Sequence, residues 1–447
     1  MAKMNKFFPG IGRIEYHPEA GPEDTLVYRH YDSKEIIEGK PMEEWFKFAP
    51  SFFNTFRKEG RGKYPSSPSS SNIKLKYKLQ LKLVSRHVGI NLEVHLVLLF
   101  LLFNGCDRDL CPDFDNFDET CLAQEEMCNF AYDLQRQTKI RPLYFSCDLF
   151  SHPRYCNGAA TNPDAHVFAY ACAQLKHALE MAKRLGAENF VFFHPRDGYQ
   201  SLIQRNIFRD VAHLGQLYRM ALQYRDKIGY RGQFLIQPKP YDPRRFQYEC
   251  DAMSVMAMLR QFGVERHFKL YIKPGYSKMM GRPYEHDVYI ASAFNMLGMI
   301  DASDNWPEIH TTSDVVPYNV RSATYVMKCV MEQGGLQNGG FTLGFKTRRE
   351  AIEPRDLFHA YILAMDTYAR ALKNAARMLT DGCFARSIQQ RYLTYKSSIG
   401  ERLDKGNCVF EECEDFIRKA GPIKPTTSSY ESFENMFNFY VFPPLPH

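Results

Sequence analysis

The sequence lacks a long hydrophobic run and an excess of charge of one sign. Its longest apolar run, Leu96 to Phe103, is far shorter than the ~20 residues of a membrane-spanning helix. Met1 to Pro9 contain no apolar core of a secretory signal. The net charge is only +6, from 57 basic and 51 acidic side chains that are interspersed. These absences predict a cytoplasmic protein that binds neither nucleic acid nor membranes.

The 12 cysteines lack a regular spacing, and no CxxC pair recurs among them. This usage favours reduced thiols over a disulfide framework. The irregular spacing of Cys106, Cys111, Cys121 and Cys128 also argues against a structural zinc site. With 447 residues, of which 45% are hydrophobic, the chain can bury a full core in one large domain or two smaller ones.

From about residue 140 to 375, short apolar segments alternate with longer amphipathic ones. In one unit, Asn162 and Pro163 suit the start of a helix, Gly186 suits its end, and an apolar strand follows at 190–193. The same pattern predicts helices near 199–228, 252–262 and 288–297, and strands at 234–236, 269–272 and 299–300. This alternation indicates a parallel sheet, either open or closed as an eight-stranded barrel.

Polar residues follow several of the expected strands, which favours the closed form. In a TIM barrel the strand ends and the loops after them converge on one site. The residues at these positions are Arg196, Gln237, Lys273 and Asp301. We therefore predict an α/β fold, a (β/α)8 TIM barrel with an N-terminal extension and a C-terminal helical arm.

We expect four segments, an N-terminal extension with the start of the barrel (1–57), an atypical stretch (58–105), the barrel body (106–385) and a helical arm (386–447). In the atypical stretch, Lys and Leu alternate over 74–83. This alternation is typical of a strand, but a misread reading frame or a retained intron can also produce such a sequence. The arm includes a Pro/Thr/Ser segment at 422–429 and a closing helix near 430–439. It either lies on a neighbouring subunit or packs on its own chain.

A series of motifs in consistent order resembles xylose isomerase, in the longer class that has an N-terminal extension. The resemblance covers everything except roughly residues 58–105. The motifs are GKPMEEWFKFAPSFFNTF (39–56), GAATNPD (158–164), RDGY (196–199), GQFLIQPKP (232–240), IDA (300–302), KTRR (346–349), EPRDLF (353–358), MDTYARALK (365–373) and SFENMFNFY (432–440).

The resemblance implies a homo-oligomeric barrel, a tetramer or dimer, that interconverts D-xylose and D-xylulose by a hydride shift. It also implies two Mg²⁺, Mn²⁺ or Co²⁺ ions at the barrel mouth, acting as Lewis acids and held mainly by carboxylates. Of seven family ligand positions, Asp301 and Asp314 keep their acid. The other five carry Gln237, Lys273, Tyr276, Thr312 and Gly344. Metal binding is therefore expected to be weak or absent.

The other family positions of the sugar site are partly changed. Cys106 replaces the histidine that assists ring opening, whereas its partner Asp109 is kept. Phe193 and Tyr144 replace two tryptophans of the substrate walls. Lys239, which in the family hydrogen-bonds the C1 oxygen of the sugar, is retained. The resemblance thus assigns Lys239, Asp109 and Cys106 to the catalytic positions.

Two replacements have alternative interpretations. Lys273 either neutralises Asp301 or Asp314 in place of a metal ion, or extends its ammonium group to solvent. Cys106 is either a nucleophile whose pKa is lowered by Arg108, or a buried structural thiol.

Three accounts of the whole protein follow. It is an isomerase with an altered site, a pseudoenzyme that binds sugars or co-assembles with an active paralogue, or the product of a faulty gene model or decaying copy.

Overall fold

The computed structural model describes residues 14–16, 27–29, 103–110, 114, 116–138, 142–306, 315–345, 351 and 354–442. The strand expected over 74–83 and the ligand positions Thr312 and Asp314 lie outside these residues, as does the side chain of Asp109. The chain divides into two compact units, one of residues 1–318 and 333–366, the other of residues 319–332 and 367–447.

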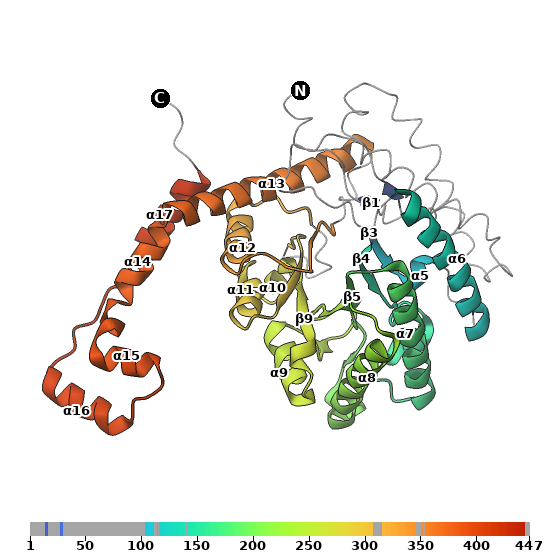
Figure 1. Cartoon of the computed structure of the whole chain (residues 1–447), viewed down its shortest axis with the longest axis horizontal. Coiled ribbons are helices and arrows are strands. Elements are labelled where there is room, and N and C mark those ends of the chain that lie inside the picture. The colour runs from blue at the N-terminus through green and yellow to red at the C-terminus, as the bar shows by residue number, and fades with distance from the viewer. Residues whose placement is uncertain are drawn as a thin grey trace. The chain divides into compact units, whose positions relative to one another are not determined.

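The first unit is built on a curled parallel sheet (Figure 1). The strands found in the described residues stand in the same order in space as in the chain, and every neighbouring pair is parallel. This confirms the predicted TIM-barrel fold. The strands are β3 (Phe103–Cys106), β4 (Pro142–Ser146), β5 (Asn189–Phe192), β7 (Gln233–Ile236), β9 (Phe268–Ile272), β10 (Leu297–Asp301) and β11 (Phe341–Thr342).

Two short antiparallel pairs lie outside this sheet. The strands β1 (Ile14–Tyr16) and β2 (Val27–Arg29) form one pair, and β6 (Gly198–Tyr199) and β8 (Phe246–Gln247) form the other.

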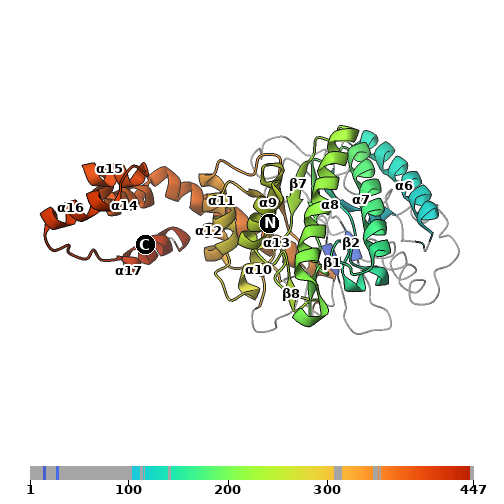
Figure 2. The same cartoon turned by 90° about the horizontal axis from the view of Figure 1, so that it is seen from below.

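Helices follow most strands, and α6, α7 and α8 lie side by side in Figure 2. The helices of this unit are α5 (Asp107–Leu110), α6 (Phe117–Thr138), α7 (Ala165–Leu185), α8 (Ile207–Ile228), α9 (Ala252–Phe262), α10 (Pro274–Met279), α11 (His286–Ala293) and the start of α13 (Pro354–Asp381).

Helix α7 ends as predicted but begins later than predicted. Gly186 ends it in the left-handed conformation at φ 66°, which glycine adopts without strain. The N-cap is Asp164, whose carboxylate accepts a hydrogen bond from the backbone N–H of His166. Asn162 instead holds the preceding turn, because its side chain donates to the carbonyl of Gly158 and accepts from the N–H of Asp164.

Two other helix boundaries differ from the prediction for similar reasons. The helix expected from residue 199 begins at Ile207, because Gly198 and Tyr199 pair with β8 and Asn206 caps the helix. The helix expected over 288–297 ends at Ala293. Asn295 has φ 55°, which stops a right-handed helix, and β10 begins at Leu297.

Both faces of the sheet are buried, as is usual for parallel strands. The outer face packs aromatic rings against α8, where Phe192 and Phe268 contact Tyr218 at ring-centroid distances of 5.4 and 5.1 Å. The inner face forms a separate cluster inside the sheet. Its members are Leu143, Val191, Leu235, Tyr271 and Met299.

The second unit consists of helices with a small core of their own. Tyr325 stacks on Phe437 at 4.0 Å, and Met378 and Phe384 are buried nearby. The helix predicted near 430–439 is present. The unit comprises α12 (Val320–Glu332), the end of α13, α14 (Cys383–Arg391), α15 (Ser398–Asp404), α16 (Phe410–Ala420) and α17 (Tyr430–Val441). None of the helices in the described ranges has the length and apolarity to cross a membrane.

Candidate functional site

The inner face of the sheet continues into the candidate site. Successive side chains of a strand point to opposite faces, so a residue two positions after an inner one lies on the same side. Counting two residues onward from four of the five inner residues, those of β5, β7, β9 and β10, gives a position at or just after the end of each strand. These residues are Phe193, Gln237, Lys273 and Asp301. The fold therefore brings these predicted site residues to the carboxyl ends of neighbouring strands.

Lys273 and Asp301 form an ion pair at this end of the sheet. The Lys273 ammonium lies 3.6 Å from Oδ2 of Asp301, and the two side chains are only 8% and 9% exposed. Lys273 also donates to the carbonyl of Gly344 at 3.4 Å, and its ammonium lies 5.4 Å from the centre of the Tyr276 ring. The ammonium is thus directed at the buried Asp301 and Tyr276.

The other oxygen of the same carboxylate is bound by the backbone at Gly344. The N–H of Gly344 donates to Oδ1 of Asp301 at 2.9 Å. A Cβ atom at residue 344 would lie 2.5 Å from Oδ2 of Asp301, which is closer than real Cβ contacts come. An aspartate at residue 344 would therefore require Asp301 to move. The glycine N–H and the lysine ammonium thus contact both oxygens of Asp301.

This arrangement does not fit the metal pair that the family resemblance implies. Divalent ions of this kind prefer several carboxylate oxygens, whereas the oxygens of Asp301 already face an ammonium and an amide N–H. Across the ranges that the structure covers, no three His, Cys, Asp or Glu side chains are grouped so as to hold an ion.

Aromatic side chains of the inner cluster lie next to this ion pair. The hydroxyl of Tyr271 bonds Oγ1 of Thr342 at 2.6 Å, and its ring lies 5.7 Å from that of Tyr144. Burial, followed by the negative charge of Asp301, raises the pKa of Tyr271 well above its ordinary value, so the phenol stays neutral. Phe193, which like Tyr144 stands where the family resemblance expects a tryptophan, packs edge-on against Phe150 with the ring centroids 5.4 Å apart.

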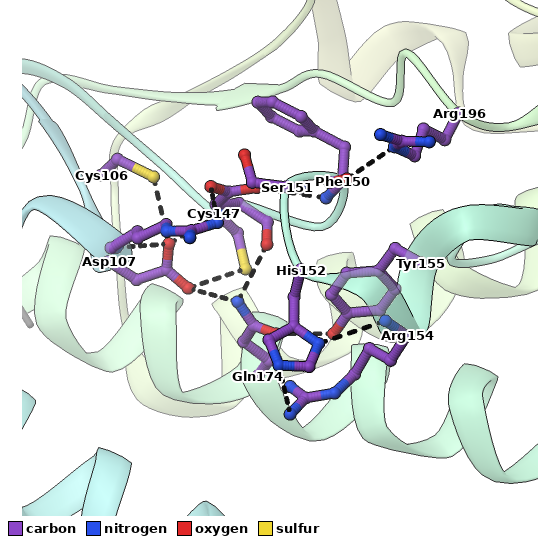
Figure 3. Close-up of polar contacts among 12 residues, drawn as sticks. Cys106, Asp107, Cys147, Phe150, Ser151, His152, Arg154, Tyr155, Gln174 and Arg196 are labelled. Atoms are coloured by element: carbon purple, nitrogen blue, oxygen red, sulfur yellow. Dashed lines mark hydrogen bonds and ion pairs between the residues drawn. The ribbon is translucent and has the colours of Figure 1, made fainter. Parts of the chain in front are cut away.

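A second buried carboxylate, Asp107, organises the segment after β3 (Figure 3). Cys106 donates its thiol proton to Oδ1 at 3.1 Å, while Cys147 and Gln174 donate to Oδ2 at 3.3 and 2.7 Å. Burial and then the charge of Asp148 raise the pKa of Asp107, and the hydrogen bonds partly offset this rise. Sequence reasoning missed this network.

Cys106 is therefore placed beside an acid. A neighbouring carboxylate disfavours a thiolate, which supports the structural interpretation of Cys106 over the nucleophilic one. The guanidinium of Arg108, considered as the activating group, lies 3.3 Å from Oδ2 of Asp148. Arg196, which also follows a strand, donates from Nε to the carbonyl of Phe150 at 2.7 Å (Figure 3).

Lys239 lies in the loop after β7 and is held by two contacts. Its ammonium is 3.3 Å from Oδ2 of Asp242, and its backbone N–H donates to the carbonyl of Glu249 at 2.8 Å. The side chain is almost entirely buried. A positive charge at this end of the sheet suits a ligand with oxygen acceptors.

Glu249 belongs to a buried cluster that sequence reasoning also missed. Its carboxylate lies 3.2 Å from Nδ1 of His194 and accepts a hydrogen bond from the Tyr218 hydroxyl. Burial alone would lower the pKa of His194, but the hydrogen bond and charge of Glu249 outweigh it and raise that pKa. One signal was available, because His194 is a polar residue just after a predicted strand.

The chain resembles known proteins over almost its whole length. Residues 388–441 match the model of the XylA2 C-terminal domain. Xylose isomerase of Arabidopsis thaliana is 35% identical over 437 residues, covering 96% of this chain and 90% of that protein. Xylose isomerase of Thermotoga maritima is 33% identical over 440 residues, covering 98% of each.

Among solved structures, a xylose isomerase domain protein from Alicyclobacillus acidocaldarius is similar, with a TM-score of 0.44 and 12% identity. It covers 70% of this chain and 96% of that chain.

Proposed function

The chain belongs to the xylose isomerase family, and from this premise we propose that its barrel mouth binds a sugar while the family's metal-dependent isomerisation is impaired. The ion pair between Lys273 and Asp301 is the observation that carries this proposal. The family reaction converts D-xylose to D-xylulose by a hydride shift that depends on divalent ions acting as Lewis acids. A buried ammonium at a ligand position repels such ions and neutralises the carboxylate that would bind them.

Sugar binding is supported by the retained lysine Lys239 and by two aromatic side chains at the family's substrate-contact positions. Lys239 is nearly buried, and its ammonium has a carboxylate partner in the same loop, so its position is restrained. A restrained ammonium can donate hydrogen bonds to the oxygens of a polyhydroxylated ligand. Phe193 and Tyr144 supply apolar walls at the positions that the family resemblance assigns to substrate contact.

A coupled assay of D-xylulose formation, run on the full chain with and without EDTA, tests the proposal. We expect a rate close to that without enzyme, unchanged by EDTA or by added Mg²⁺ or Mn²⁺. The melting temperature should also stay the same when these ions are added, because a bound ion would raise it. The Thermotoga maritima relative serves as the positive control for the assay.

The possible outcomes separate the competing accounts. Clear turnover that EDTA abolishes would refute the proposal and indicate an isomerase with an altered metal site. Saturable binding of D-xylose without turnover, measured by calorimetry, would identify a sugar-binding pseudoenzyme. In that case Lys239→Met should weaken D-xylose binding, whereas Lys176→Met, on the exposed side of α7, should not.

We further propose that the chain forms a homo-oligomer through its C-terminal helices. The segment 388–441 matches a domain model of its own, and the described part of it exposes several large apolar side chains. Apolar surface of this kind is typical of contacts between subunits. A second copy of this chain is the partner that we expect, and an active paralogue is the alternative.

A further inference from the structure

Two cysteines of the second unit meet at the corner between α15 and α16. The Sγ atoms of Cys408 and Cys413 lie 3.4 Å apart. A disulfide bond places its sulfur atoms about 2.05 Å apart, so these two atoms would have to approach by little more than about 1 Å to bond. Both side chains are only partly buried within the chain itself.

The corner that carries these thiols is held from both sides. Arg402 of α15 donates to the carbonyl of Asn407 at 3.1 Å and pairs with the carboxylate of Glu412. Glu412 in turn accepts a hydrogen bond from the N–H of Val409 at 3.2 Å, which completes the cap of α16. These contacts keep Cys408 close to the first turns of α16, where Cys413 lies.

Other thiols in the described ranges contact oxygen atoms. Cys106 and Cys147 donate to Asp107, Cys250 contacts Ser254, and Cys383 contacts Tyr440. At the corner of α16, Cys408 likewise contacts the carbonyl of Val409 at 3.8 Å, but here the two sulfur atoms also contact each other directly. A sulfur–sulfur contact of this kind permits chemistry that the oxygen contacts do not.

We propose that Cys408 and Cys413 are a redox modification site, forming an internal disulfide with a small disulfide oxidant such as oxidised glutathione. One protein thiolate attacks a sulfur of the oxidant and releases the first glutathione thiolate. The second protein thiol then attacks the mixed disulfide and releases the other. Two protein thiols are oxidised, one glutathione disulfide is reduced, and the two thiol protons pass to the glutathione thiolates.

The surroundings of Cys408 disfavour its thiolate. Desolvation, followed by the hydrogen bond to Cys413 and the neighbouring Glu412, raises the pKa of Cys408 to about 11. Cys408 therefore keeps its proton at neutral pH and can donate it to Cys413.

The test equilibrates the full chain with oxidised or reduced glutathione, blocks free thiols with iodoacetamide and maps the peptides by mass spectrometry. We expect a Cys408–Cys413 cross-link in the oxidised sample, lighter by two hydrogen atoms and reversed by dithiothreitol. Cys408→Ser should leave Cys413 as a stable mixed disulfide with glutathione. Cys156→Ser removes an exposed thiol elsewhere, and this variant should still form the cross-link.

Hydrogen exchange gives a second readout that does not depend on alkylation. The disulfide should slow amide exchange at the corner, residues 405–413, in the wild type and in Cys156→Ser, but not in either serine variant of the pair. The proposal fails if Cys408 and Cys413 are alkylated separately, carry separate glutathione adducts, or cross-link to other cysteines.

Discussion

At the scale of single residues, the pair of Lys273 and Asp301 supports the proposal that this barrel mouth does not hold the family's metal pair. Removing a carboxylate from water is costly unless a charge or hydrogen bonds compensate it. In the family that compensation comes from metal ions, whereas here the ammonium of Lys273 and the N–H of Gly344 face the two oxygens. Lys273 is therefore expected to support the fold as well as to exclude a metal ion.

The variant Lys273→Met should lower the free energy of unfolding by about 3 kcal/mol, because it leaves Asp301 buried without a cation. The double variant Lys273→Met/Asp301→Leu should recover much of this loss, since neither charge remains. Urea unfolding followed by circular dichroism measures both. Lys176→Met, which breaks an exposed pair with Glu180, is the control and should cost no more than about 0.5 kcal/mol. Equal losses in the two single variants would contradict the argument.

His194 predicts a dependence of stability on pH. Its folded-state pKa lies above the unfolded value of about 6.5, because Glu249 favours the imidazolium. The pair therefore stabilises the fold fully below about pH 6.5, and this contribution is lost as the pH rises through the raised folded value. Tyr218 and Asp197 are the other titratable groups that face His194.

Chemical unfolding of the wild type and His194→Gln at a series of pH values tests this linkage. The stability advantage of the wild type should be largest in mild acid and should shrink as the pH rises above about 6.5. An NMR titration of the wild-type imidazole checks the same shift directly. An advantage that stays constant or grows with pH would mean that His194 is neutral in the folded chain.

At the scale of helices and strands, local patterns predicted most of the barrel. Helix α9 has the predicted bounds, because Asp251 caps it and Gly263 ends it in the left-handed conformation. The strands β7 and β9 begin one residue earlier than predicted. Caps, glycines and apolar periodicity act within a few residues, so they can be read without the tertiary structure.

The misplaced boundaries depend on partners distant in the sequence. The start of α8 was predicted too early because β6 pairs with β8, almost fifty residues further along. The same limit applies to the candidate site. Strand ends could be predicted from the alternation, whereas the pairing of Lys273 with Asp301 or Asp314 was one of two interpretations that rested on the family resemblance. The contact of Asp107 with Gln174 joins residues 67 positions apart, and that of His194 with Glu249 joins residues 55 positions apart. No local sequence pattern indicates either contact.

At the scale of the whole molecule, the second unit combines a small core with much exposed apolar surface. The core is closed by α17, where Phe437 and Tyr440 are buried against α12 and the end of α13. The segment from 403 to 423 is different, because α16 has no buried residue in this chain. Its exposed side chains include Leu403, Phe410, Phe416, Ile417 and Ile423. We expect this surface to be covered by a second copy of the chain.

Replacing Phe410 and Ile417, which lie seven residues apart and so share one face of α16, tests this assembly. Light scattering should show a homo-oligomer for the wild type and a smaller mass for Phe410→Glu/Ile417→Glu, with circular dichroism unchanged. Phe208→Glu, at an equally exposed position on α8, is the control and should leave the mass unchanged. If the double variant keeps the wild-type mass, α16 does not form the subunit contact. The segment would then be a packing extension of its own chain, the alternative that the sequence left open.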